Sequence, residues 1–156
     1  MPGQEYEASA FTYNFQGSSS VFLEFWDINQ NLILFSNASN NTTNQWKQLG
    51  LNLAAPPDAK FVSLRVYSGL GNIGTSYFDD AEIQILAQDP NVMLRNGGME
   101  TVMDGLPRYW STLFDATSST STERKRSGER SVKIMDSKNN GGIGLRSARI
   151  PVTAGL

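Results

Sequence analysis

The stretch EYEASAFTYNF (residues 5–15) alternates residue by residue between two kinds of side chain. A period of two is that of a β-strand, whose successive side chains point to opposite faces of a sheet. The small residues Ala8 and Ala10, together with Tyr6, suit a packed interior. The alternate positions then place Phe11 and Tyr13 on the outer face. The stretch therefore predicts a strand with one buried face and an aromatic outer face.

Similar strand patterns recur along the chain, bounded by Gly, Asn, Ser or Pro. They are SVFLEFWDIN (20–29), NQWKQLGLNL (44–53), KFVSLRVYSG (60–69), TSYFDDAEIQIL (75–86), SVKIMDS (131–137) and IGLRSARIPV (143–152). Short strands separated by turn residues at this spacing are typical of an all-β sandwich or barrel. No segment sustains a 3.6-residue apolar period, so we expect little helix.

Composition narrows the function classes. A length of 156 residues suits one domain with a sizeable core, and a net charge of −2 gives no attraction to nucleic acid or anionic membrane. The basic run ERKRSGER (123–130) contains two glutamates and no aromatic residue, which favours a solvated loop over a nucleic-acid surface. The absence of Cys and His excludes thiol chemistry, disulfides and Ser-His-Asp catalysis. No apolar run approaches the roughly 20 residues of a membrane span.

Several motifs resemble carbohydrate-binding jelly-roll modules of families four, nine and twenty-two. The likeness to the first half of such a module lies in RNGGMET (95–101), DGLPRYW (104–110), SGERSVKI (127–134) and SARIPVTAG (147–155). The likeness to the second half lies in PGQEYEASAF (2–11), VFLEFWD (21–27), WKQLGLNLAAPPDAKFVSLRVYSG (46–69) and GTSYFDDAEIQI (74–85). The two halves stand in reversed order.

The resemblance implies an all-β, two-sheet jelly-roll sandwich that is circularly permuted relative to the usual module. On this interpretation 1–156 is one module. Residues 1–87 are its second half, 88–96 a linker and 97–156 its first half. Gly3 and Gly155 would mark the same turn in a tandem array of modules, so we expect Met1 and Leu156 to lie close together. We favour closure within one chain as a monomer; a swapped dimer is the alternative.

The family topology also implies that the strands at 5–13, 21–28, 61–68 and 131–136 share one sheet. Their period-2 phase would place aromatic and charged side chains together on its outer face. The predicted ligand-binding residues are Trp26, Tyr67, Tyr13, Arg65, Glu24, Phe11 and Lys133. Sugar rings have apolar C–H faces that stack on aromatic side chains, and sugar hydroxyls need polar partners. The segment 131–146 departs from the family pattern because it contains no aromatic residue.

A structural calcium ion is implied by the same resemblance. Its ligands would be Glu100 of the NGGME stretch, Asp79 or Asp80 of the FDD pair, and carbonyls near Gly98 and Arg126. Calcium is a hard cation that takes six or more oxygens from carboxylates and carbonyls. Two adjacent carboxylates in one strand otherwise repel each other, which also invites a cation.

We therefore expect a non-catalytic module that targets an attached enzyme or surface protein to a polysaccharide or oligosaccharide. The expected context is a secreted or cell-surface bacterial protein in which neighbouring modules are further partners. The alternative is a structural spacer or assembly repeat that binds no glycan. We do not expect an enzyme, because nothing in the sequence places two carboxylates at catalytic separation across a cleft. Trp46 and Trp110 are expected to pack in the core or at its rim.

Overall fold

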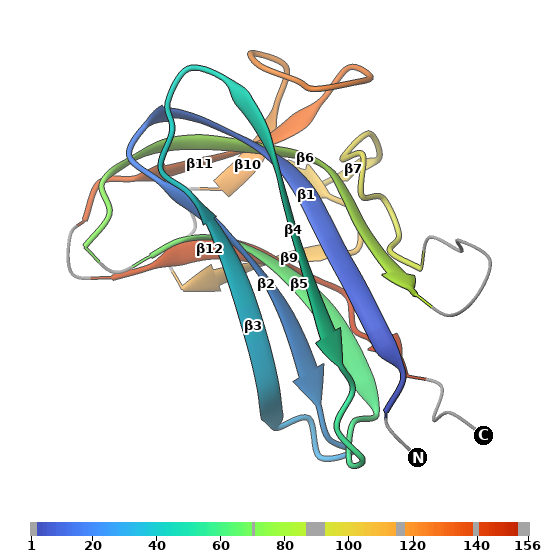
Figure 1. The fold of residues 1–156 in the computed structure, drawn as a ribbon. Helices are drawn as coiled ribbons and strands as arrows, with labels where there is room; N and C mark the ends of the chain where they lie inside the picture. Colours follow the sequence, from blue (N-terminus) through green and yellow to red (C-terminus); the bar gives the residue numbers. More distant parts are fainter. Residues whose placement is uncertain (1–2, 70, 87–92, 115–117, 139–140, 153–156) are drawn as a thin grey trace.

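Strands dominate the computed structural model, which describes residues 3–69, 71–86, 93–114, 118–138 and 141–152. They form two main antiparallel sheets that pack against each other as a β-sandwich (Figure 1). The described residues contain no helix, as the sequence predicted. Consequently none of the described segments is a helix long and apolar enough to cross a membrane.

Sheet A has the strand order β10-β11-β6-β1-β4. Its strands are β1 (Glu5–Gln16), β4 (Trp46–Ala54), β6 (Gly74–Ile85), β10 (Ser118–Ser121) and β11 (Ser131–Asp136). Sheet B has the order β3-β2-β5-β12-β9, with β13 also paired to β5. Its strands are β2 (Ser19–Trp26), β3 (Leu32–Asn40), β5 (Phe61–Ser68), β9 (Trp110–Phe114), β12 (Ile143–Ser147) and β13 (Ile150–Pro151). A separate small hairpin joins β7 (Val102–Met103) to β8 (Leu106–Pro107).

The core lies between the two sheets and confirms the predicted inward phase of four strands. The predicted inward residues are all at most 1% exposed: Tyr6, Ala8, Ala10, Val21, Leu23, Phe25, Val62, Leu64, Val66, Val132 and Ile134. Trp110 is also buried, at 6% exposed, and Trp46 is half-buried at the edge of sheet A. A period of two was enough to predict which of these side chains point inward, because each strand has one face in the core.

The predicted grouping of strands into sheets was wrong. β1 and β11 belong to sheet A, whereas β2 and β5 belong to sheet B. Both sheets turn their apolar faces inward, so the outward residues of these strands lie on opposite sides of the sandwich. The phase of a strand is a local property of its sequence. Its partner strands are set by long-range pairing, which the phase does not determine.

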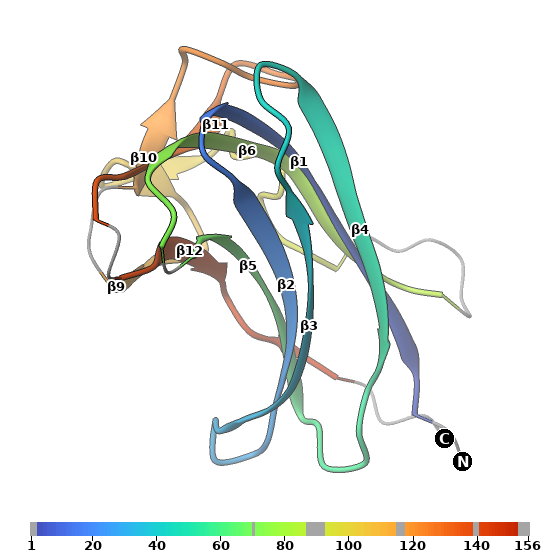
Figure 2. The same ribbon diagram turned by 60° about the vertical axis from the view of Figure 1, so that its left-hand side comes forward.

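Strand β3 was missed by the sequence analysis and forms one edge of sheet B. It pairs with β2 along its length, and β4 is the corresponding edge of sheet A (Figure 2). The segment that crosses from β3 to β4 is held by buried amides. Asn14 donates to the carbonyls of Asn40 and Thr42 at 2.8 and 3.0 Å, and Asn40 donates to Thr12 Oγ1 at 2.8 Å. These bonds satisfy polar groups that burial would otherwise penalise.

Residues 93–97, which include the described end of the predicted linker, run back along β6. Met93 donates its N–H to the carbonyl of Ile83, and Ala81 donates to the carbonyl of Gly97, both at 2.9 Å. The expected meeting of Met1 with Leu156 lies outside the described residues, as do linker residues 88–92. The permuted order of the halves therefore stays a prediction.

Candidate functional site

Four aromatic rings form a row across the outer surface of sheet B, which we call face B. The Phe22 ring centroid lies 5.8 Å from that of Phe35 and 5.7 Å from that of Tyr67, and Tyr67 lies 6.5 Å from Phe114. Phe35 is on β3 and Phe114 ends β9, so the row runs from one edge of the sheet to the other. These two end rings are the most open, at 51% and 77% exposed.

Glycines of the neighbouring strand make room for Tyr67 in this row. Gly144 on β12 is directly opposite Tyr67 on β5. A Cβ atom on Gly144 would overlap the carbonyl oxygen of Val66, and one on Gly142 would overlap the Tyr67 hydroxyl. The Tyr67 side chain therefore occupies space that side chains at these positions would fill. Gly142 and Gly144 thus leave a slot in which the aromatic ring of Tyr67 lies.

A buried glutamate makes ion pairs with two arginines in the middle of face B. Glu24 is 0% exposed although it points to the outer side of the sheet. Arg146 donates from Nε to Oε2 at 2.6 Å and from Nη2 to Oε1 at 3.0 Å. Ser63 adds a hydrogen bond from Oγ to Oε2 at 3.2 Å. A desolvated carboxylate is stable only when it is paired in this way.

A second arginine shares the same carboxylate. The Nε of Arg65 lies 3.1 Å from Glu24 Oε1, in ion-pair range, although it is not aligned to make a hydrogen bond. Arg65 and Arg146 are directly opposite each other on β5 and β12. Like charges in that position repel. Burial lowers the pKa of Arg65, the charge of Glu24 opposes this shift, and the charge of Arg146 adds to it.

Aromatic stacking completes the cluster. The Arg65 guanidinium lies 4.0 Å from the Phe22 ring centroid and 4.8 Å from that of Tyr67, in the middle of the aromatic row. Trp26 is only 6% exposed, because Arg146 and Arg149 lie 4.7 and 4.1 Å from its ring centroid. Its indole N–H donates to Ser63 Oγ at 2.8 Å. Trp26 thus packs against the arginines and Ser63 of the cluster, and its ring is not open to solvent.

The outer surface of sheet A, which we call face A, also has an aromatic row. It consists of Phe11, Tyr13 and Phe15, all on β1. The basic run 123–130 lies over this row: Arg124 is 4.7 Å from the Tyr13 ring centroid and 5.7 Å from that of Phe15, and Arg126 is 4.4 Å from that of Phe11. Tyr13 is only 9% exposed, because the Trp46 and Tyr77 rings also lie 5.6 and 6.2 Å from its ring centroid. The basic loop therefore covers part of face A.

Beside this row, face A has a polar hollow of about 430 Å³. Its lining residues are Phe15, Thr75, Tyr77, Glu123, Arg124 and Lys133. Tyr77 and Lys133 each donate to Glu123 Oε2 at 2.7 Å. Burial and the hydrogen bond to Glu123 raise the pKa of Tyr77, and the hydrogen bond to Glu123 raises that of Lys133. The charges in this hollow are thus largely paired with one another.

The predicted ligand-binding residues do not form one surface. Face B has Glu24, Trp26, Arg65 and Tyr67, whereas face A has Phe11, Tyr13 and Lys133. The first group is brought together by direct contacts, and the second lies under or beside the basic loop. Phe35, Phe114 and Arg146 were missed as members of face B. An apolar run (LILF) and outward phase in IGLRS are the signals that point to Phe35 and Arg146. Phe114 has a left-handed φ of 63°, which strand periodicity does not predict.

The predicted calcium ligands converge on the basic loop. A bulge in β6 shifts its register against β1 between Ser9 and Phe11, and Asp80 there has a left-handed φ of 47°. Adjacent residues of a regular strand point to opposite faces, but a bulge changes the aim of its side chains. Asp79 Oδ2 accepts the N–H groups of Arg126 and Ser127 at 2.8 and 3.2 Å. Asp80 Oδ1 accepts the Ser127 hydroxyl at 2.6 Å.

Glu100 contacts the same loop at Glu129 and Arg130. Both of its carboxylate oxygens accept the N–H of Glu129, and Oε1 accepts that of Arg130. Asp80 Oδ1 and Glu100 Cγ each lie within 4 Å of the position that a Cβ on Gly98 would take. Burial raises the pKa of Asp79 to about 6, although the N–H groups of Arg126, Ser127 and Asp80 act against the shift.

This donor set fits calcium in part. Three carboxylates and a glycine-rich turn give the hard oxygen chemistry that the ion requires. Across the described segments, no three Asp or Glu side chains are close enough together to hold a metal among themselves. Carbonyl or water oxygens would have to complete the shell. In the structure the carboxylates serve as acceptors that fix the loop 126–130 above face A.

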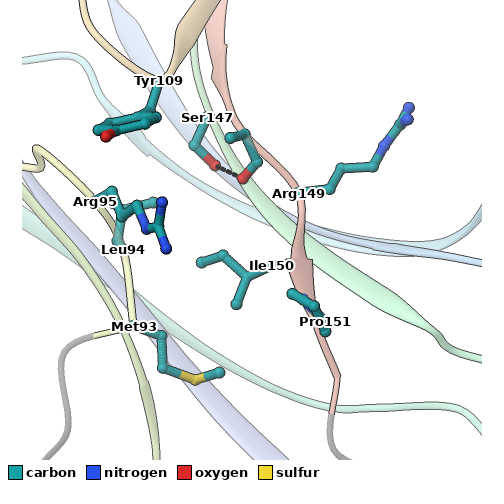
Figure 3. Close-up of a pocket in the computed structure, with 9 residues that line it drawn as sticks. Met93, Leu94, Arg95, Tyr109, Ser147, Arg149, Ile150 and Pro151 are labelled. Carbon is teal, nitrogen blue, oxygen red and sulfur yellow. Dashed lines mark hydrogen bonds between the residues drawn. The ribbon is translucent and has the colours of Figure 1, made fainter.

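A separate pocket of about 320 Å³ lies where linker residues 93–95 meet β13 (Figure 3). Arg95 and Tyr109 lie on one side of it, with the Arg95 guanidinium 5.4 Å from the Tyr109 ring centroid. Leu94, Ile150 and Pro151 contribute apolar lining, while the Arg149 side chain points away. None of these lining residues was predicted from the sequence to be functional. Tyr109 has a left-handed φ of 72°, which is unusual for an aromatic residue.

Comparison with known proteins found no relative of the chain. No protein-family model, no curated protein and no solved structure matches the chain.

Proposed function

We propose that this chain is a non-catalytic carbohydrate-binding module whose ligand surface is face B. The observation that supports this most is the open aromatic row, in which Phe35 and Phe114 are 51% and 77% exposed at either end. An exposed apolar surface of this kind on a folded domain calls for a partner. Sugar rings suit it because their C–H faces stack on aromatic rings.

The polar groups of face B strengthen the proposal. Hydroxyl groups of a sugar need donors and acceptors beside the stacking surface, and Arg65 and Arg146 are 14% and 19% exposed in their side chains. Both are fixed by the buried Glu24. A ligand would therefore meet guanidinium groups that are already in position, which lowers the entropy lost on binding. Such a module holds an attached enzyme or surface protein close to its polymer and so raises the effective concentration.

Affinity gel electrophoresis against a panel of soluble glucans, xylans and other polysaccharides tests this proposal. We expect at least one polymer to retard the protein, and Phe114→Ala or Phe35→Ala to reduce the retardation. Phe15→Ala is the matched control, because Phe15 is 55% exposed but belongs to face A. If no polymer retards the protein, the proposal fails. Equal losses from Phe114→Ala and Phe15→Ala would refute the assignment to face B.

The second candidate function, an assembly repeat without glycan binding, is favoured by the edge strand β3. Four consecutive apolar residues there, Leu32, Ile33, Leu34 and Phe35, are 36% to 51% exposed. An uncharged, exposed edge strand is a template for pairing with another chain. Light scattering separates the alternatives: a mass near 17.2 kDa supports the monomeric module, and a multiple of it supports assembly or a swapped dimer.

We also propose that calcium binds between the bulge of β6 and the basic loop. The proposed ligands are Asp80, Glu100 and Asp79, with carbonyls near Gly98 and Arg126 as further donors. The proposal is supported by the convergence of these carboxylates on one loop. Isothermal titration with calcium should give one site per chain in the wild type and none in Asp80→Asn. Equal binding by both proteins would contradict this assignment.

A further inference from the structure

Face B has a local excess of positive charge in a chain whose net charge is −2. The strands of sheet B contain two arginines, Arg65 and Arg146, but only one acidic residue, Glu24. Arg149 follows β12 and lies against Trp26 beside them. The strands contain no lysine. Two guanidinium groups thus contact a single buried carboxylate, and a third, that of Arg149, lies nearby against Trp26.

The arrangement leaves one of the opposing arginines only partly compensated. Arg146 makes two aligned hydrogen bonds to Glu24. Among the described residues, Arg65 makes an ion pair with Glu24, but its Nε makes no hydrogen bond. The two arginines are directly opposite each other across β5 and β12. A second anion beside them would reduce their repulsion. Because both are largely buried, its charge would be weakly screened.

The position of Arg65 connects this charge to the aromatic row. Its guanidinium lies 4.0 Å from the Phe22 ring centroid and 4.8 Å from that of Tyr67. A glycan chain that follows the row from Phe35 to Phe114 must pass over it. Guanidinium groups bind carboxylate and sulfate through two parallel hydrogen bonds, a geometry that a neutral hydroxyl does not match.

We infer that the ligand of face B is an anionic polysaccharide, with carboxylate or sulfate groups attached to sugar rings. This inference rests on the proposed carbohydrate-binding function and specifies its substrate class. The rings of the polymer stack on the aromatic row, and its anionic groups pair with Arg65 and Arg146. Arg149 adds positive charge at the rim.

Matched pairs of polymers test the inference by affinity electrophoresis. Polygalacturonate and fully methyl-esterified galacturonan share one backbone and differ in carboxylate charge. Dextran sulfate and dextran differ in the same way for sulfate. We expect at least one charged polymer to bind at least tenfold more tightly than its neutral counterpart, with a further loss of binding as NaCl rises from 20 to 500 mM. The pair that discriminates identifies carboxylate or sulfate as the recognised group.

Variants separate a specific site from general attraction to a polyanion. Arg149→Gln removes one charge from face B, and Arg124→Gln removes one from face A. We expect about a tenfold loss of affinity for the first and little change for the second. Arg65→Lys keeps the charge but removes the planar fork, so it should also weaken binding.

The binding measurements distinguish failure of the inference from failure of the proposed function. Binding to neutral polysaccharides with no preference for the charged member of either pair would overturn the inference and leave the proposed function intact. Equal losses from Arg149→Gln and Arg124→Gln would overturn it as well, because the attraction would then be nonspecific. A lack of binding to every polymer, neutral or charged, would refute the proposed function and the inference with it.

Discussion

Arginines stack on aromatic rings on both faces, but those of face A come from a loop and those of face B come from the sheet itself. Arg124 and Arg126 come from a loop that folds over β1, so they cover the rings of Tyr13 and Phe11. Arg65 and Arg146 come from strands of the sheet itself and are tied to the buried Glu24. The same two kinds of side chain therefore produce a covered surface on one side of the sandwich and an open surface on the other.

The difference lies in where the cations are anchored. On face A the position of the arginines depends on the loop, which the carboxylates of Asp79 and Glu100 hold in place. On face B it depends on strand register and on one desolvated carboxylate. Face B should therefore be rigid and ready for a ligand, whereas the cover of face A should respond to whatever loosens the loop.

The largest expected effect comes from removing the anchor of face B. Glu24→Gln leaves two arginines without their common counter-charge, and we expect it to lower the free energy of unfolding by about 3 kcal/mol. Glu123→Gln removes the corresponding charge from the exposed pair with Lys133 on face A. Urea denaturation should detect no comparable loss there, since exposed ion pairs contribute little. Similar losses from both variants would contradict the contrast between the faces.

Bound calcium should stabilise the loop over face A and should not change the structure of face B. At a free concentration about 100 times its Kd, a bound ion should stabilise the fold by about 2.7 kcal/mol, measured by thermal unfolding with calcium and with a chelator. Glu100→Gln should abolish the difference. Calcium should also slow amide exchange in the loop 126–130. An unchanged melting temperature would contradict the calcium proposal.

The glycine slot for Tyr67 should be sensitive to a single methyl group. Gly144→Ala places a Cβ against the backbone of β5, and we expect a loss of about 2 kcal/mol in the free energy of unfolding. Gly141→Ala is the control, because nothing lies within 4 Å of a Cβ at that position. If both variants are equally stable, then Gly144 does not hold the aromatic row in place.

The smallest effect is expected from uncovering face A. Arg124→Ala removes the cation that stacks on Tyr13 and should cost about 0.5–1 kcal/mol. Exposure of the Tyr13 ring should increase its accessibility to a soluble fluorescence quencher. Polysaccharide retardation should stay as in the wild type. An increase in retardation would indicate that the loop hides a second ligand surface.

The orientation of side chains within single strands could be predicted from the sequence. The inward phases of β1, β2, β5 and β11 follow from the period of two, and all of their predicted inward residues are buried. The resemblance predicted that Glu100 and Asp79 or Asp80 would bind calcium near Arg126; these carboxylates do contact the loop 126–130, and the ion itself stays a prediction. The division of the outward residues between two faces did not follow, because strand partners are fixed by pairings far apart in the sequence.

Other features of the site escaped prediction for identifiable physical reasons. The run LILF in β3 does not alternate, because β3 is an edge strand and is exposed on both sides. The orientation of Phe114 depends on a left-handed backbone conformation at the end of β9. The role of Gly144 depends on its partner, Tyr67, which is far away in the sequence. Of these three features, only the Gly144–Tyr67 pair depends on residues from separate parts of the chain.

A titration followed by ¹H–¹⁵N NMR tests the central claim most directly, namely that face B binds the ligand and face A does not. The probe is an oligosaccharide of whichever polymer retards the protein most strongly. We predict that chemical-shift changes concentrate at Phe22, Phe35, Tyr67 and Phe114 and at the guanidinium Nε of Arg65 and Arg146. Shifts that concentrate instead at Phe11, Tyr13 and the loop 124–130 would contradict the account.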